Sequence, residues 1–290
     1  MKISNKLKNK KESGQMVLIL VLMTIVGVTI GLSLVSRTIQ DVRISSQIEQ
    51  SSRAFSAAEA GVENALKFSN AGSYNGTIDV GGTSSSYQSQ VTNIGGGAAG
   101  STLVTFGLTD VNQTQTIWLT DHSPGGDLME SSYYPLGEPI YICWQNGSPT
   151  PAAVITLYYK NGSSYYVIKG AYDPVFVRGG SNSFRWGLPE GTGGNCGGVP
   201  GYNYQVTITP TTSAGNYQVP GGSILLFAKV QMLYVSSPLA VLSSSTNSFP
   251  PQGKQITSVG QTASGVTRRI QVIQGFKTLP SLLDFALYSQ

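Results

Sequence analysis

The sequence predicts an α+β protein: a single long N-terminal helix, its first half spanning a membrane, followed by a β-rich, antiparallel, sandwich-like head. Two observations predict this class. No charged residue interrupts the 20 positions from Met16 to Val35. Beyond residue 101, short runs rich in Val, Ile, Thr and Tyr alternate with Gly, Asn and Pro turn signals, a pattern typical of strands. A helix of about 20 apolar residues can cross the bilayer core, and it pairs its own backbone groups there.

The helix is expected to cover residues 15–69, because no proline interrupts it before the stop signal Asn70-Ala71-Gly72. About 55 helical residues are roughly 80 Å long, so the second half extends beyond the bilayer. Its apolar residues recur in steps of three, four and seven, which predicts one face packed on the head. The positions on this face are Ile44, Ile48, Phe55, Ala58, Val62 and Leu66.

The net charge of +4 is concentrated in the first 14 residues, which carry five lysines and one glutamate. Residues 71–290 carry nine basic and nine acidic residues, so the head is neutral overall and nothing suggests nucleic-acid binding. Lysines beside an apolar span remain cytoplasmic. The sequence therefore predicts a single-pass protein of the inner, cytoplasmic membrane, in contact with lipid, with its N-terminus inside and its head outside.

Two cysteines, Cys143 and Cys196, are the only ones in the chain. An oxidising compartment outside the cytoplasmic membrane would join them in a disulfide bond. The alternative is a pair of buried free thiols.

The domain organisation follows from these signals. Residues 1–14 form a basic leader, residues 70–100 a Gly/Ser-rich linker, residues 101–279 the β-rich head, and residues 280–290 a short C-terminal helix. A β-sandwich over about 110–215 is inserted in the head or follows it. The apolar stretch from Ser223 to Val235 predicts a central strand packed on the distal helix. Asn161-Gly162 predicts the turn of a hairpin.

No motif for catalysis or cofactor binding is found, and we predict neither an enzyme nor a cofactor. The single histidine, His122, lies between Asp121 and Ser123, but three consecutive residues cannot form a catalytic relay. The acidic side chains nearby could surround a calcium ion, but the spacing of a calcium loop is missing, and an acidic surface loop is the other interpretation. These acidic residues are Asp110, Asp121, Asp127 and Glu130.

The N-terminal quarter of the chain resembles a known family. A basic leader ending in Gly14, the apolar span after it and the stretch Ser52 to Val62, which reads SRAFSAAEAGV, resemble type IV pilin-like precursors with a PilX-type minor pilin N-terminus. A weaker likeness lies in GVTRRIQV, from Gly265 to Val272. The resemblance covers about residues 10–69.

The resemblance implies processing and assembly. A prepilin peptidase would cut between Gly14 and Gln15 and methylate the new amine, and the helix would then pack against other pilins at the pilus assembly platform. The fifth mature residue would be Ile19, where major pilins carry a glutamate, and this departure suits a subunit at the tip or start of a filament. Gly27 and Gly31 form a G-x-x-x-G pair that permits close helix packing, although glycine is also common in membrane helices.

The expected function is structural: a minor or tip subunit in assembly of a type IV pilus or related surface filament. The tyrosine pairs are a candidate adhesive surface, and strand packing explains them equally well; they are Tyr133/Tyr134, Tyr158/Tyr159 and Tyr165/Tyr166. The alternative is a single-pass membrane-anchored surface or adhesion protein that never enters a filament.

Overall fold

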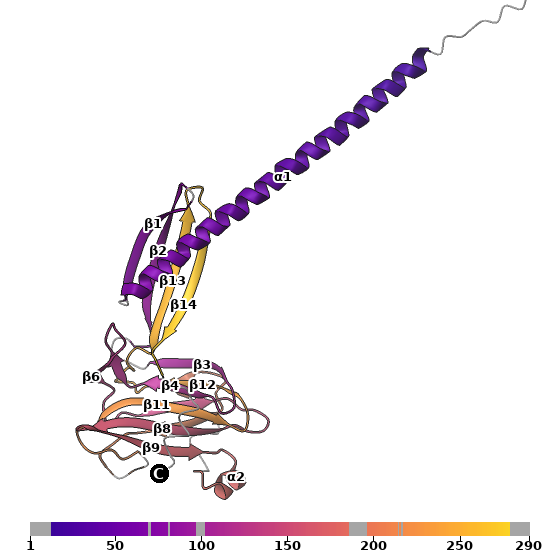
Figure 1. Cartoon of the computed structure of the whole chain (residues 1–290). Helices are drawn as coiled ribbons and strands as arrows, with labels where there is room; N and C mark the ends of the chain where they lie inside the picture. The colour runs from indigo at the N-terminus through magenta and orange to yellow at the C-terminus, as the bar shows by residue number, and fades with distance from the viewer. Residues whose placement is uncertain are drawn as a thin grey trace, which may run out of the picture.

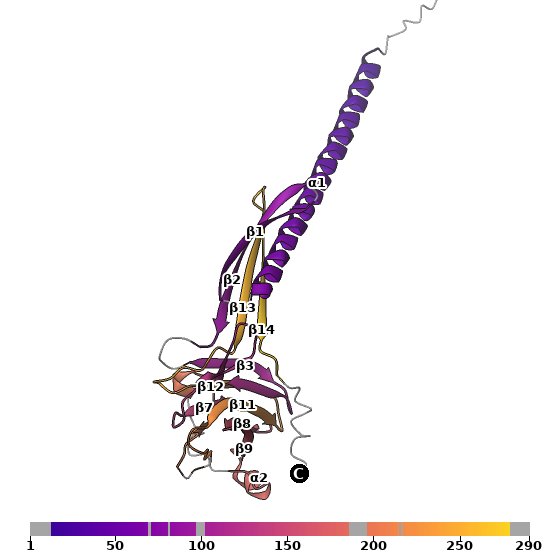
Figure 2. The ribbon, with the colours of Figure 1, turned by 60° about the vertical axis from the view of Figure 1, so that its left-hand side comes forward.

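The computed structural model describes residues 13–68, 71–80, 82–96, 102–185, 196–213, 215 and 217–278. It confirms the α+β class. The helix α1 (Ser13–Phe68) is followed by a four-stranded sheet along its C-terminal half and by a β-sandwich beyond its end (Figures 1 and 2). Most of the predicted leader and the whole predicted C-terminal helix lie outside the described residues.

The first sheet is built from both ends of the head. Its strand order is β1-β2-β13-β14, and all neighbouring strands are antiparallel. The prediction of a linker over residues 70–100 was therefore wrong, because this segment forms the hairpin β1-β2. The strands are β1 (Gly72–Val80), β2 (Thr83–Ile94), β13 (Gly253–Thr262) and β14 (Thr267–Gly275). We call α1 with this sheet the helix-bearing unit.

The sandwich is inserted between β2 and β13 of the first sheet. The chain leaves at Ile94 and returns at Gly253, which face each other in the antiparallel register, so the insertion does not disturb the pairing. It extends from β3 to β12 and is therefore longer than the predicted 110–215. The apolar stretch from Ser223 to Val235 contains a central strand, as expected, but this strand belongs to the sandwich and not to the sheet on α1.

Two four-stranded antiparallel sheets form the sandwich, with strand orders β10-β7-β12-β3 and β4-β11-β8-β9. Alternate residues of each strand point inward to a shared core, in which Trp144, Ile142, Ile155 and Val230 are fully buried. The first sheet of the sandwich comprises β10 (Tyr204–Ile208), β7 (Ile140–Trp144), β12 (Ser237–Leu242) and β3 (Leu103–Thr109). The second comprises β4 (Thr114–Trp118), β11 (Ile224–Leu233), β8 (Ala152–Asn161) and β9 (Ser164–Tyr172).

Short elements complete the sandwich. The hairpin of β5 (Thr120–His122) and β6 (Leu128–Tyr133) lies next to β11. The predicted Asn161-Gly162 turn joins β8 to β9, and Gly162 has the positive φ of 59° that this turn requires. The helix α2 (Phe176–Ser181) follows β9, and the 3-10 turn η1 (Cys196–Gly198) precedes β10.

Candidate assembly surface on the long helix

The N-terminal half of α1 extends away from the rest of the described structure (Figure 1). Every side chain from residue 15 to residue 49 is exposed, and the helix is long and apolar enough to cross a membrane. The hydroxyls of Thr24, Thr29 and Thr38 donate to the carbonyls of Val21, Val26 and Leu34, three or four residues earlier. Since these hydroxyls are satisfied within the helix, they do not oppose its burial in lipid or against other helices.

The predicted site residues of the helix lie along this bare half. Gly14 and Gln15 are in its first turn. Ile19 is 48% exposed and adds no charge to the apolar surface. An added Cβ at Gly27 or Gly31 would meet no atom within 4 Å, so the G-x-x-x-G pair has no partner inside the described chain and leaves room for another helix.

The C-terminal half of α1 packs on its sheet mainly through small residues, so the predicted apolar face is correct only in part. Ala54, Ala57, Ala58 and Ala65 are buried, with at most 1% of each exposed. Of the predicted apolar face, Ala58 is buried, and the partly buried Val62 packs against Ala65, Val91 and Ile256. The other large members of that face are exposed, such as Phe55 at 47% and Ile48 at 64%.

Two glycines set the short distance between helix and sheet. An added Cβ on Gly260 of β13 would lie 2.0 Å from the carbonyl oxygen of Ala54 and 2.5 Å from the amide nitrogen of Ala58. An added Cβ on Gly61 would lie 2.3 Å from the Oγ of Ser258. The sequence does contain a signal for the sheet-facing side of the helix. Small residues recur at 54, 57, 58, 61 and 65, a spacing that marks a helix face in close contact with another backbone.

A bare stalk therefore separates the apolar span from the sheet. Ser46 and Glu49 line a pocket with residues of the sheet, and hydrogen bonds join Gln50 to Thr262 and Ser51 to Arg268. If the span from Met16 to Val35 occupies the bilayer, residues 36–49 cross about 21 Å of water at 1.5 Å per residue. This stalk carries exposed Ile39, Val42, Ile44 and Ile48. Isolated helices of this length are marginal in water.

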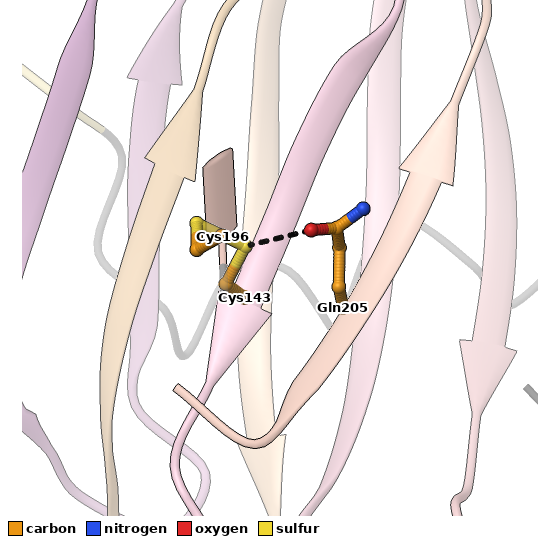
Figure 3. The surroundings of a disulfide bond; sticks show 3 residues. All are labelled: Cys143, Cys196 and Gln205. Atoms are coloured by element: carbon orange, nitrogen blue, oxygen red, sulfur yellow. Dashed lines mark hydrogen bonds between the residues drawn. A yellow bond between two sulfur atoms is a disulfide. The ribbon is translucent and has the colours of Figure 1, made fainter. Parts of the chain in front are cut away.

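The predicted disulfide between Cys143 and Cys196 is confirmed. Trp144, the next residue on β7, points into the core, so Cys143 points to the outer face of the sandwich. Figure 3 shows the bond beside the Gln205 side chain of β10, whose Oε1 lies 4.0 Å from the Sγ of Cys143. The bond therefore fastens η1 to one sheet and does not link the two sheets.

Removing the disulfide should destabilise the sandwich by up to about 4 kcal/mol, the value of the chain-entropy model for a loop of this size. The two cysteines are 53 residues apart. Urea unfolding of the double variant Cys143→Ala/Cys196→Ala should have a lower midpoint than that of the wild type. A reducing agent should lower the wild-type midpoint and leave the variant unchanged. Equal midpoints of the wild type and the variant would contradict a stabilising role.

Three of the acidic residues singled out by the sequence, Asp110, Asp121 and Glu130, have separate partners. Glu130 pairs with Lys160 at 2.6 Å, and Asp110 accepts a hydrogen bond from Ser236. Asp121 accepts a hydrogen bond from the backbone of His122. Within the described ranges, no group of three or more His, Cys, Asp or Glu side chains is arranged to hold a metal ion.

No model of a known protein family matches the chain, and no curated protein matches it significantly.

Proposed function

We propose that this chain is the precursor of a type IV pilin-like subunit that takes part in filament assembly as a minor or tip component. A prepilin peptidase removes the leader after Gly14 and methylates Gln15. The helix then leaves the bilayer at the assembly platform and packs against the helices of other pilins. The resemblance of residues 10–69 to PilX-type minor pilins is the sequence basis of this proposal.

The apolar stalk is the observation that carries the proposal. A simple membrane anchor needs an apolar surface only within the lipid. Here exposed apolar side chains continue through the stalk and along the outer face of α1 beside the sheet, through Phe55 as far as Leu66. An exposed apolar stripe of this extent indicates a binding surface for other protein. The bare stalk and the open G-x-x-x-G pair both favour neighbouring helices as that protein.

Ile19 supports a tip or initiating position. In the major pilins of the family that this chain resembles, the glutamate at the fifth mature position neutralises the N-terminal amine of a neighbouring subunit. A charge in an apolar filament core requires such a partner. A chain with Ile19 offers no carboxylate at this site. It therefore fits a position in the filament where no subunit lies above it and no amine needs to be neutralised.

Mass spectrometry of the mature N-terminus tests the proposal. Filaments sheared from cells should contain this chain at low stoichiometry, beginning at Gln15 and carrying one added methyl group. A Gly14→Val variant should keep its leader and be missing from the filaments. A chain that retains Met1 in the membrane and never enters filaments would overturn the proposal in favour of a single-pass anchored surface protein.

A further inference from the structure

Specific hydrogen bonds form part of the contact between the helix-bearing unit and the sandwich. Gln252, just before β13, holds the two together through its side-chain amide. Its Oε1 accepts from the backbone nitrogen of Trp118 at 2.7 Å, and its Nε2 donates to the carbonyl of Trp118 at 2.9 Å. Its own backbone nitrogen donates to the carbonyl of Ile94, the last residue of β2. These bonds join β4 of the sandwich to the two strands where the insertion begins and ends.

An aromatic stack forms the second part of this junction. Phe276, directly after β14, lies flat against His122 of β5, with ring centroids 3.7 Å apart and an interplanar angle of 6°. The ring of Trp118 is edge-on to both of these rings. Its centroid lies 4.5 Å from that of His122 and 6.2 Å from that of Phe276. His122 is thus packed between an aromatic ring of its own sandwich and one from the helix-bearing unit.

The imidazole is held in a setting that favours its neutral form. Its Nδ1 is buried and has no hydrogen-bond partner among the described residues. Of the charged groups near it, Asp121 on β5 favours the imidazolium and Lys254 on β13 opposes it. The rings from β4 and from the segment after β14 carry no charge. Burial is the largest effect and lowers the pKa of His122 below its ordinary value of 6.5.

We propose that His122 makes the junction between the two units acid-sensitive, so that the sandwich is fixed to the helix-bearing unit at neutral pH and released on acidification. Protonation places a second N–H on the imidazole at a buried position that has no acceptor. Separation of His122 from Phe276 gives this N–H access to water. The release does not depend on whether the chain enters a filament.

The direction of the pH dependence follows from the linkage between protonation of His122 and opening of the junction. The closed junction disfavours the imidazolium, whereas an opened junction hydrates His122 and gives it an ordinary pKa near 6.5. The closed state therefore has its full stability above about pH 6.5 and loses it as the pH falls below this value. The buried N–H without an acceptor destabilises the closed state. The population of the open state should therefore rise about fivefold or more when His122 is protonated.

Pulsed electron paramagnetic resonance on the full chain in detergent micelles tests the proposal. Spin labels on Ser163→Cys, in the β8-β9 turn, and Ala263→Cys, in the β13-β14 turn, report the distance between the units. The two native cysteines are joined to each other, so they do not react with the label. We expect a narrow distance distribution at pH 7.5 and a broad one at pH 5.0, with circular dichroism unchanged.

Three variants test whether the broadening at pH 5.0 arises from protonation of His122 in the aromatic stack. His122→Phe keeps the ring and should keep the narrow distribution at both pH values. Asp121→Asn removes the favourable charge and should enlarge the acid response, whereas Lys254→Gln should reduce it. An unchanged wild-type distribution at pH 5.0, or a broadening that persists in His122→Phe, would overturn the proposal.

Discussion

Replacing Gly260 with alanine should separate α1 from its sheet and destabilise the helix-bearing unit by about 3 kcal/mol or more, at the upper end of the usual cost of overpacking. The added methyl group would lie 2.0 Å from the carbonyl oxygen of Ala54 and 2.5 Å from the nitrogen of Ala58. Both are backbone atoms of a continuous helix, so no side-chain rotation can relieve the clash. The helix must move outward, and Ala57 and Ala58 then lose their contacts with β13.

Thermal unfolding of the full chain in detergent measures this effect. Gly275→Ala is the matched control, because Gly275 ends the neighbouring strand β14 and an added Cβ there meets nothing within 4 Å. The control should unfold like the wild type. In Gly260→Ala the transition of the helix-bearing unit should move to lower temperature, while that of the sandwich stays in place. A wild-type melting profile for Gly260→Ala would show that the helix does not lie this close to the sheet.

The larger features of the fold could be predicted because each has a strong local signal. The uncharged run from Met16 to Val35 predicts a span, and the Asn161-Gly162 turn predicts a hairpin. The apolar stretch around Val230 predicts a buried central strand. The disulfide was predicted from the number of cysteines and the expected compartment, and its position on the outer face of β7 follows from the inward position of Trp144.

The hairpin β1-β2 was missed for a physical reason. The helix approaches its sheet closely, so the buried positions of β2 are occupied by Ser85, Ser89 and Val91 and not by large apolar residues. Serine-rich strands resemble loops in sequence. The same close approach explains why the predicted helix face is correct only in part, because buried alanines contribute little hydrophobic signal while Ile48 and Phe55 contribute much.

The junction could not have been predicted from sequence. His122 is 154 residues from Phe276 by the numbering, and their stacking depends on where the sandwich is inserted into the first sheet. Similarly, nothing local indicates that the amide of Gln252 binds the backbone of Trp118. Such contacts follow from topology, which sequence patterns constrain only weakly.

Replacing Ile48 with lysine should leave the protein folded and membrane-inserted but remove it from filaments. Ile48 is 64% exposed and lies near the end of the stalk. The melting temperature of the isolated protein should therefore stay that of the wild type. Between packed helices, by contrast, an unpaired ammonium group costs several kcal/mol, which corresponds to a loss of incorporation of at least about tenfold.

Quantifying the chain in sheared filaments and in membranes separates the two possible roles of the stalk. Gln47→Lys is the matched control, since it adds the same charge one position away at an exposed polar site. If α1 packs against sister helices through its apolar stripe, Ile48→Lys should accumulate in the membrane while Gln47→Lys is incorporated much more like the wild type. If both variants enter filaments as well as the wild type does, the stripe is not the assembly surface, and the exposed isoleucines of the stalk require another partner.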